Sequence, residues 1–324
     1  SVNSLKSNLK GLRRTPEGAF SRSCSNSQGC SLRSRRHRLC EEAMEKFRQF
    51  VVFLGAAALL GSLSVVIVVI WVLHWRGGLA WDYGLLEFNW HPVLSTTGLI
   101  FINGFGIIIY RLPWTWNIRK PLMKYIHAGM NIVTFVLMVI SLLAVFDFHN
   151  SKKIPNMYSL HSWIGLAAVI MHALQLLLGL CTFLLPCTPT FIRTFYMSFH
   201  VGVGLFIFGM SVTAAEMGIT EKLIFSLRSG SNTTLPYSQS PPEAILVNTL
   251  GVFILLFGGC ILWIAIHPEW KRPPEHLKEN VGGEDASILN KTNVSAEIGN
   301  ENIPEGIERL RHLHFEDVGQ RATF

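Results

Sequence analysis

Four histidines are the residues of this chain best suited to do chemistry within a membrane. His91, His127, His161 and His200 each lie near one end of a separate long apolar segment. An ionisable side chain is costly in hydrocarbon and therefore marks a candidate functional site, and imidazole is a standard axial ligand of haem iron. One such histidine is as often a packing residue as a ligand. Four on consecutive segments at matched depths indicate haem ligation.

The segments that must position these histidines are predicted to be membrane-spanning helices. The 324 residues are 49% hydrophobic and only 15% charged. Six apolar runs can each cross a hydrocarbon core of about 30 Å, which takes about 20 helical residues. We expect an all-α membrane protein with six transmembrane helices in one bundle over residues 44–270. The predicted crossings are 50–72, 92–110, 125–146, 158–185, 195–215 and 244–266.

The regions outside the bundle are predicted to be disordered. Residues 1–43 are rich in Ser, Arg and Cys, and residues 271–324 form a polar tail, predicted to be cytosolic. The first apolar run begins too late for a cleavable signal peptide, and Met44 resembles a natural start, so we expect an upstream extension. No glycine pattern of a nucleotide site follows a strand, and no nucleic-acid partner is expected. The six cysteines map to the cytosolic side or the inner half of the bundle, where no disulfide framework is expected.

Basic residues near the segment ends set the predicted orientation. They cluster before the first segment, in the second connection and after the last segment, which should therefore be cytosolic together with both termini. The connections on the opposite side also carry basic residues, so the basic residues that flank the first and last segments determine the predicted orientation. Asn232 of an Asn-Thr-Thr sequon then lies in the longest outer loop and is predicted to be glycosylated. The sequons at Asn290 and Asn293 would be cytosolic and unused.

Threading the segments through the membrane pairs the histidines by depth. His91 and His161 come to the outer side, and His127 and His200 to the inner side. Each pair joins alternate helices, so a four-helix core would hold two b-type haems. Bis-imidazole ligation leaves no open position for oxygen and favours electron transfer.

Other polar residues within the segments have less specific interpretations. His172 follows His161 by eleven residues and would lie about 16 Å deeper, without a partner at its level, so we assign it a structural hydrogen bond. Asn131 and Gln175 are interpreted as polar contacts within or between helices. Glycines such as Gly204 could make space for flat macrocycles, although plain helix packing explains them nearly as well.

Four motifs resemble the cytochrome b561 family of ascorbate-dependent transmembrane electron carriers, and in particular its plasma-membrane ferric reductase. They are LEFNWHP at 86–92, IYRLPW at 109–114, KYIHAG at 124–129 and NMYSLHSW at 156–163. The similarity begins near residue 44, continues through the sixth helix and recurs in the tail around residues 316–323. The resemblance implies the same four haem ligands and a homodimer. It also implies that Arg111, Lys120, Lys124 and Arg193 bind cytosolic ascorbate, while Asn156, Tyr158 and Ser159 shape an outer substrate site.

The substrate sites also follow from charge. Arg111, Lys120 and Lys124 form a basic patch that suits an anion such as ascorbate, and they also anchor the inner side of the membrane. On the outer side a ferric or cupric ion could bind to oxygen and imidazole ligands. The ordinary alternative is that these side chains belong to loops and are only solvated. These outer candidates are His74, Asp82, Glu87, Asp147 and His149.

The predicted function is electron transfer from cytosolic ascorbate through two haems to an extracytoplasmic ferric or cupric ion, in the plasma membrane and in contact with its lipid. One alternative acceptor is monodehydroascorbate within a vesicle. Another is iron within a lysosome, with an endosomal, vesicular or lysosomal location. An alternative of a different class is a haem-free six-helix receptor or channel.

Overall fold

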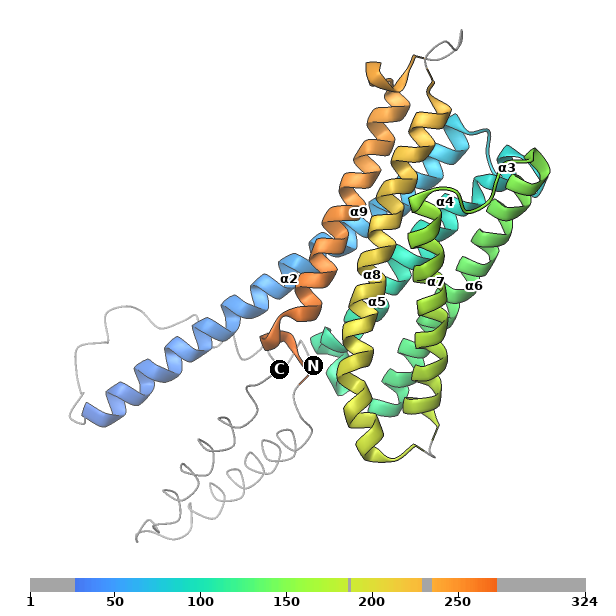
Figure 1. The fold of residues 1–324 in the computed structure, drawn as a ribbon. Coiled ribbons are helices and arrows are strands. Elements are labelled where there is room, and N and C mark those ends of the chain that lie inside the picture. The colour runs from blue at the N-terminus through green and yellow to red at the C-terminus, as the bar shows by residue number, and fades with distance from the viewer. Residues whose placement is uncertain (1–26, 186–187, 229–234, 273–324) are drawn as a thin grey trace. The chain divides into compact units, whose positions relative to one another are not determined.

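The described part of the chain forms a bundle of long helices (Figure 1). The structure is a computed structural model that describes residues 27–185, 188–228 and 235–272. Six helical spans in it are long and apolar enough to cross a membrane, which confirms the six predicted crossings. The predicted glycosylation site at Asn232, the tail and its two sequons lie outside the described residues.

The first three crossings are α2, a segmented second span and α6. Helix α2 covers Ser27–Trp75. The second span consists of α3 (Leu85–Phe88), α4 (Trp90–Ser95), the π-helical turn η1 (Thr96–Ile102), α5 (Asn103–Ile108) and the 3-10 turn η2 (Ile109–Arg111). A short 3-10 segment, η3 (Pro113–Asn117), leads to α6 (Lys120–Lys152).

The last three crossings are α7, α8 and α9. Helix α7 covers Leu160–Gly179 and continues into a π-helical turn, η4 (Leu180–Leu184). Helix α8 covers Thr190–Ser226, and α9 covers Pro242–Ile266. The 3-10 turns η5 (Tyr237–Gln239) and η6 (Pro268–Trp270) precede and follow α9.

Helix α2 begins earlier than the sequence predicted. We expected disorder through residue 43, whereas the helix already includes residues from Ser27. This stretch has no proline, and several of its residues, such as Arg, Leu, Glu and Lys, are good helix formers. Glu45 also pairs with Arg48 one turn later, at 2.6 Å. Since residues 37–49 are exposed, local propensity rather than burial explains the helix.

Helix α8 ends later than the sequence predicted. The apolar run stops at residue 215, but the helix continues through Glu216, Glu221 and Lys222 to Ser226. Charged side chains lower hydropathy without breaking a helix, because backbone hydrogen bonds continue. The amide of Leu227 still donates to the carbonyl of Leu223, at 2.9 Å. The outer part of α8 therefore places charged groups beside the histidine-bearing helices.

Two clusters of apolar side chains hold the bundle together. The larger one joins α2, α5, α8 and α9 and includes Phe50, Trp71, Phe208 and Phe257. The smaller one joins the second crossing to α6 and α7. Helix α2 packs along α9 and α9 along α8, while α4 packs on α6 and α7 on α8. The histidine-bearing helices α4, α6, α7 and α8 are therefore supported by α2 and α9.

Polar contacts fix both ends of α9. Near its start, Glu243 accepts a hydrogen bond from the Trp71 indole at 2.7 Å and pairs with Arg76. After its end, the Arg111 guanidinium donates to the carbonyl oxygens of Ala265 and His267. These contacts tie α9 to α2 at one end and to the second crossing at the other.

Candidate haem-binding site

The structure brings the four histidines together in two pairs. The ring centroids of His91, on α4, and His161, on α7, are 6.0 Å apart. Those of His127, on α6, and His200, on α8, are 6.2 Å apart. These are the pairs that the threading predicted. We call the end with His91 and His161 the outer end and the other the inner end, after the predicted orientation.

Hydrogen bonds from neighbouring helices orient three of the four rings. The Nδ1 of His161 donates to the Ala214 carbonyl on α8, at 2.7 Å, and the Nδ1 of His127 donates to the Gly106 carbonyl on α5, at 2.9 Å. The Nδ1 of His91 donates to the Ser141 hydroxyl on α6, at 3.0 Å. This arrangement leaves Nε2 free, and such outer contacts are typical of metal-ligating histidines.

The fourth ring has a different environment. The Nδ1 of His200 is buried and has no hydrogen-bond partner among the described residues. The ring lies between two aromatic side chains, with centroids 5.3 Å from Phe183 and 5.9 Å from Tyr196. Packing rather than hydrogen bonding therefore holds this side chain.

Two glycines that sequence reasoning missed let helices approach these rings closely. A Cβ added to Gly218, on α8, would lie 2.6 Å from Cε1 and 2.8 Å from Nδ1 of His161. A Cβ added to Gly179, on α7, would lie 3.2 Å from Cε1 of His200. Neither position stands out in the sequence, because Gly218 follows the predicted end of its segment and glycine is common in membrane helices.

The spacing of each histidine pair suits a metal held between the two rings. A metal–imidazole bond is about 2 Å, and the ring centre lies about 1 Å beyond the nitrogen, so two axial rings on one metal are about 6 Å apart. The observed separations of 6.0 and 6.2 Å match this value. The Phe88 ring lies 6.1 Å from the His91 ring and the Tyr110 ring lies 5.6 Å from the His127 ring, and both supply aromatic surface. The residues present therefore fit a flat haem between each pair.

His172 and the two amides contact the helix backbone. The Nε2 of His172, a buried residue of α7, lies 3.3 Å from the Asn131 carbonyl. The Asn131 amide donates to the His127 carbonyl at 2.8 Å, and the Gln175 amide donates to the His200 carbonyl at 2.9 Å. A Cβ on Gly204 would lie 2.9 Å from Nε2 of Gln175, so this glycine accommodates an amide.

The predicted ascorbate residues divide between two helix ends. Lys124 donates to the Phe183 carbonyl at 3.2 Å and Arg193 to the Leu185 carbonyl at 3.0 Å, both where α7 leads to α8. Lys120 is exposed at the start of α6. Arg111 instead binds the end of α9. Since the Phe183 ring lies beside His200, Lys124 and Arg193 are on the side of the inner pair.

The predicted outer substrate residues are partly structural. Ser159 caps α7 by accepting from the Ser162 amide at 3.3 Å, and Asn156 donates to the Asn150 side chain at 2.8 Å. Tyr158 is exposed over half of its surface. Partial burial and the neighbouring Glu221 carboxylate, which hydrogen-bonds with the phenol, raise its pKa above the usual value. Tyr158 is therefore a neutral phenol at physiological pH.

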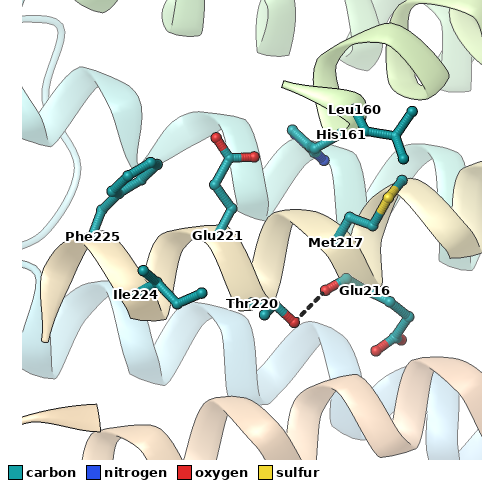
Figure 2. A pocket seen from close by; sticks show the side chains of 8 residues that line it. All are labelled: Leu160, His161, Glu216, Met217, Thr220, Glu221, Ile224 and Phe225. Atoms are coloured by element: carbon teal, nitrogen blue, oxygen red, sulfur yellow. Dashed lines mark hydrogen bonds between the residues drawn. The ribbon is translucent and has the colours of Figure 1, made fainter. Parts of the chain in front are cut away.

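A shallow cavity of about 470 Å³ opens beside the outer pair (Figure 2). His161 and Leu160 of α7 line it together with Glu216, Thr220 and Glu221 of α8. Figure 2 shows Glu221 on the side of α8 that faces α7, whereas the carboxylate of Glu216 points to the other side. Sequence reasoning singled out neither acid, because both follow the predicted end of the fifth crossing.

The outer metal candidates do not gather into a site. Asp82 accepts hydrogen bonds from the amides of Gly84 and Glu87, and the fully buried Glu87 accepts one from the Tyr83 amide. His74 packs against the Trp75 ring, at 4.3 Å. Within residues 27–185, 188–228 and 235–272, no three His, Cys, Asp or Glu side chains are grouped to hold a metal ion.

Comparison with known proteins agrees with this geometry. Residues 90–226, which include all four histidines, match the family described as eukaryotic cytochrome b561. The chain is 51% identical over 287 residues to the plasma membrane ascorbate-dependent reductase CYBRD1 of Xenopus tropicalis, covering 86% of this chain and 100% of that protein. The chain belongs to the cytochrome b561 family. Six crossings and a b-type haem are properties of that family.

Further relatives carry two different names, one of a plasma membrane reductase and one of a lysosomal membrane reductase. The human plasma membrane reductase of the same name, duodenal cytochrome b, is 50% identical over 292 residues, covering 87% of this chain and 99% of that protein. The lysosomal membrane ascorbate-dependent ferrireductase CYB561A3 of Danio rerio is 44% identical over 223 residues, covering 69% and 90%. The predicted resemblance to the plasma-membrane reductase of the family is thus confirmed.

Proposed function

We propose that this chain carries single electrons from cytosolic ascorbate through two b-type haems to ferric iron at the outer face of the plasma membrane. The two histidine pairs at about 6 Å, one near each end of the bundle, carry the proposal. The names of these relatives, ascorbate-dependent reductase and ferrireductase, support the donor and the acceptor.

The histidines have defined roles in this proposal. His91 and His161 would hold the outer haem, and His127 and His200 the inner one. A bound haem supplies reversible one-electron chemistry, and with both axial positions filled by imidazole it has no open site for oxygen. The hydrogen bonds of Nδ1 to Ser141, Gly106 and Ala214 would leave Nε2 of these three histidines available to the iron.

The inner basic residues provide the docking surface for the donor. Ascorbate is an anion at neutral pH, and Lys120, Lys124 and Arg193 lie at the end of the bundle that holds His127 and His200. A cationic rim attracts the anion and holds it within reach of the inner haem. Arg111 contributes charge to this end, although its side chain is engaged by α9.

The outer acceptor is the second element of the proposal. Tyr158, Asn156 and Ser159 directly precede Leu160 and His161, which line the cavity where an acceptor would approach the outer haem. Ferric iron, cupric ion and monodehydroascorbate are the candidate acceptors. One relative is a lysosomal membrane ferrireductase, so iron is the favoured acceptor for an internal membrane as well as for the plasma membrane.

Haem content of histidine variants tests the proposal. The purified protein should bind two haems that ascorbate reduces. His161→Ala should lose the outer haem and His200→Ala the inner one, because each removes one of two axial ligands. His172→Ala is the matched control, since its ring contacts a backbone carbonyl, and should retain both haems. Two haems per chain in His161→Ala, measured by pyridine haemochrome assay, would exclude the assignment.

A further inference from the structure

A half-buried lysine lies at the outer end of the bundle, beside the outer histidine pair. Lys222, near the end of α8, places its ammonium 3.7 Å from the centre of the Phe88 ring. Phe88 is fixed in turn, since its ring contacts Phe148 at 5.2 Å and His91 at 6.1 Å. The neighbouring Asn89 amide donates to the carbonyls of Arg76 and Gly78.

The charges around this ammonium are not balanced. Arg76 pairs with Glu243, which also accepts the Trp71 indole hydrogen, so this carboxylate is already engaged. Within the described ranges, the Lys222 ammonium makes its cation–π contact but has no hydrogen bond or ion pair. The Nε of Arg76 is also buried without a hydrogen-bond partner there. Contact with an aromatic face does not compensate an ammonium for its lost hydration, so a bound anion would stabilise Lys222 at this site.

The position of the ammonium indicates which anion belongs there. Phe88 precedes His91 by three residues, about one helical turn. The ammonium above its ring is therefore close to the place where His91 and His161 meet. We propose that Lys222 binds a carboxylate beside the outer haem, either a propionate of that haem or a carboxylate of the soluble ferric chelate. This proposal rests on the assignment of His91 and His161 as haem ligands.

A cation at this place has a consequence for electron transfer. Reduction adds one negative charge to the outer haem, and a nearby ammonium in a low-dielectric site stabilises it. Loss of Lys222 should therefore favour the oxidised haem. If the partner is a propionate, the loss also leaves that carboxylate without its counter-charge, which acts in the same direction.

A redox titration of each haem tests the role of Lys222. In Lys222→Met, the ratio of reduced to oxidised outer haem at a fixed potential should fall about tenfold, a shift of about 59 mV for a one-electron couple. The inner haem should be unchanged, and Lys222→Arg should restore most of the shift. Lys152→Met is the matched control, because Lys152 is exposed at the outer end of α6. An unchanged titration together with unchanged chelate kinetics in Lys222→Met would overturn the proposal.

Two further arms separate the sources of the carboxylate. For a propionate, the difference in outer-haem titration between the wild type and Lys222→Met should be smaller with haem dimethyl ester than with haem, because the ester has no carboxylate to pair with the ammonium. For a soluble carboxylate, the titration difference should be the same with haem and with haem dimethyl ester. The half-saturating ferric citrate concentration of Lys222→Met should then rise at least fivefold, with no change for a ferric chelate that lacks carboxylates. If Lys222→Met does not fold, Lys222→Arg and the ester-loaded wild type provide the test. A wild-type protein without two haems would instead reject the proposed function.

Discussion

At the scale of single residues, groups from other helices determine where the histidine rings lie. His161 illustrates this dependence, because Ala214 accepts its Nδ1 hydrogen while Gly218 leaves space for its ring. Both contacts come from α8, although the histidine is on α7. A histidine at this position without these neighbours would have several rotamers available for its ring.

Substitution of Gly218 should therefore impair the outer site without touching a ligand. The new Cβ of Gly218→Ala would lie 2.6 Å from Cε1 of His161, so the ring or the helix must move, at a cost of about 1–3 kcal/mol. We expect the purified variant to lose outer haem while the inner haem remains, measured by redox-resolved absorbance. Gly209→Ala is the control, since nothing lies within 4 Å of its added Cβ. Equal haem retention in both variants would contradict this role of Gly218.

At the scale of elements, basic side chains at the inner end have two different structural settings. Arg111 binds two carbonyl oxygens where α9 ends, a contact that satisfies backbone groups with no helical partner. Lys124 donates to one carbonyl of η4 beside the inner pair and is otherwise available to an anion. The positive charge of Arg111 therefore stabilises the end of α9, whereas that of Lys124 is available to attract an anion.

Neutralising these two residues should separate the two effects. Lys124→Gln should raise the ascorbate concentration for half-maximal haem reduction several-fold, because the anion loses an attracting charge. Arg111→Gln should mainly lower the free energy of unfolding, by about 1–3 kcal/mol, because carbonyls at the end of α9 lose their donor. Stopped-flow reduction and thermal unfolding measure the two effects, with the exposed Lys271→Gln as control. Normal ascorbate kinetics in Lys124→Gln would leave this lysine as an anchor only.

At the scale of the whole molecule, the two histidine pairs lie at different depths in the membrane-spanning bundle. The pairs lie toward opposite ends of the same helices, His161 at the start of α7 and His200 near the start of α8, which runs in the opposite direction. An electron that moves between them crosses much of the low-dielectric layer. In the proposed function, turnover from the cytosol to the outside would therefore transfer negative charge outward.

The membrane potential should then influence the rate. An electron that crosses the full field gains about 2.3 kcal/mol per 100 mV, and about half of that over a partial path changes a rate several-fold if interhaem transfer is limiting. Proteoliposomes with ascorbate inside and ferric chelate outside, with potassium and valinomycin setting the voltage, should form ferrous iron faster at inside-negative potential. Liposomes without ascorbate are the control. External iron that stays ferric while both haems are reduced would favour monodehydroascorbate as the acceptor.

The sequence by itself determined the number of crossings and the pairing of the histidines by depth. Hydrocarbon thickness sets the length of each apolar run, and alternation of direction assigns each histidine to one end, so neither inference requires contacts. The helix bounds were harder to predict from the sequence. Helices α2 and α8 extend beyond their apolar runs into charged sequence, because helix propensity and backbone hydrogen bonds maintain a helix where hydropathy is low.

Only the tertiary structure decided which residues support the four histidines and which are engaged elsewhere. The bond from His161 to Ala214 joins residues 53 positions apart, and that from Arg111 to His267 joins residues 156 apart. The approach of Gly218 to His161, and of Lys222 to Phe88, depends on how α8 is rotated against α7 and α3. No local pattern encodes that rotation, because it results from the packing of all the helices together.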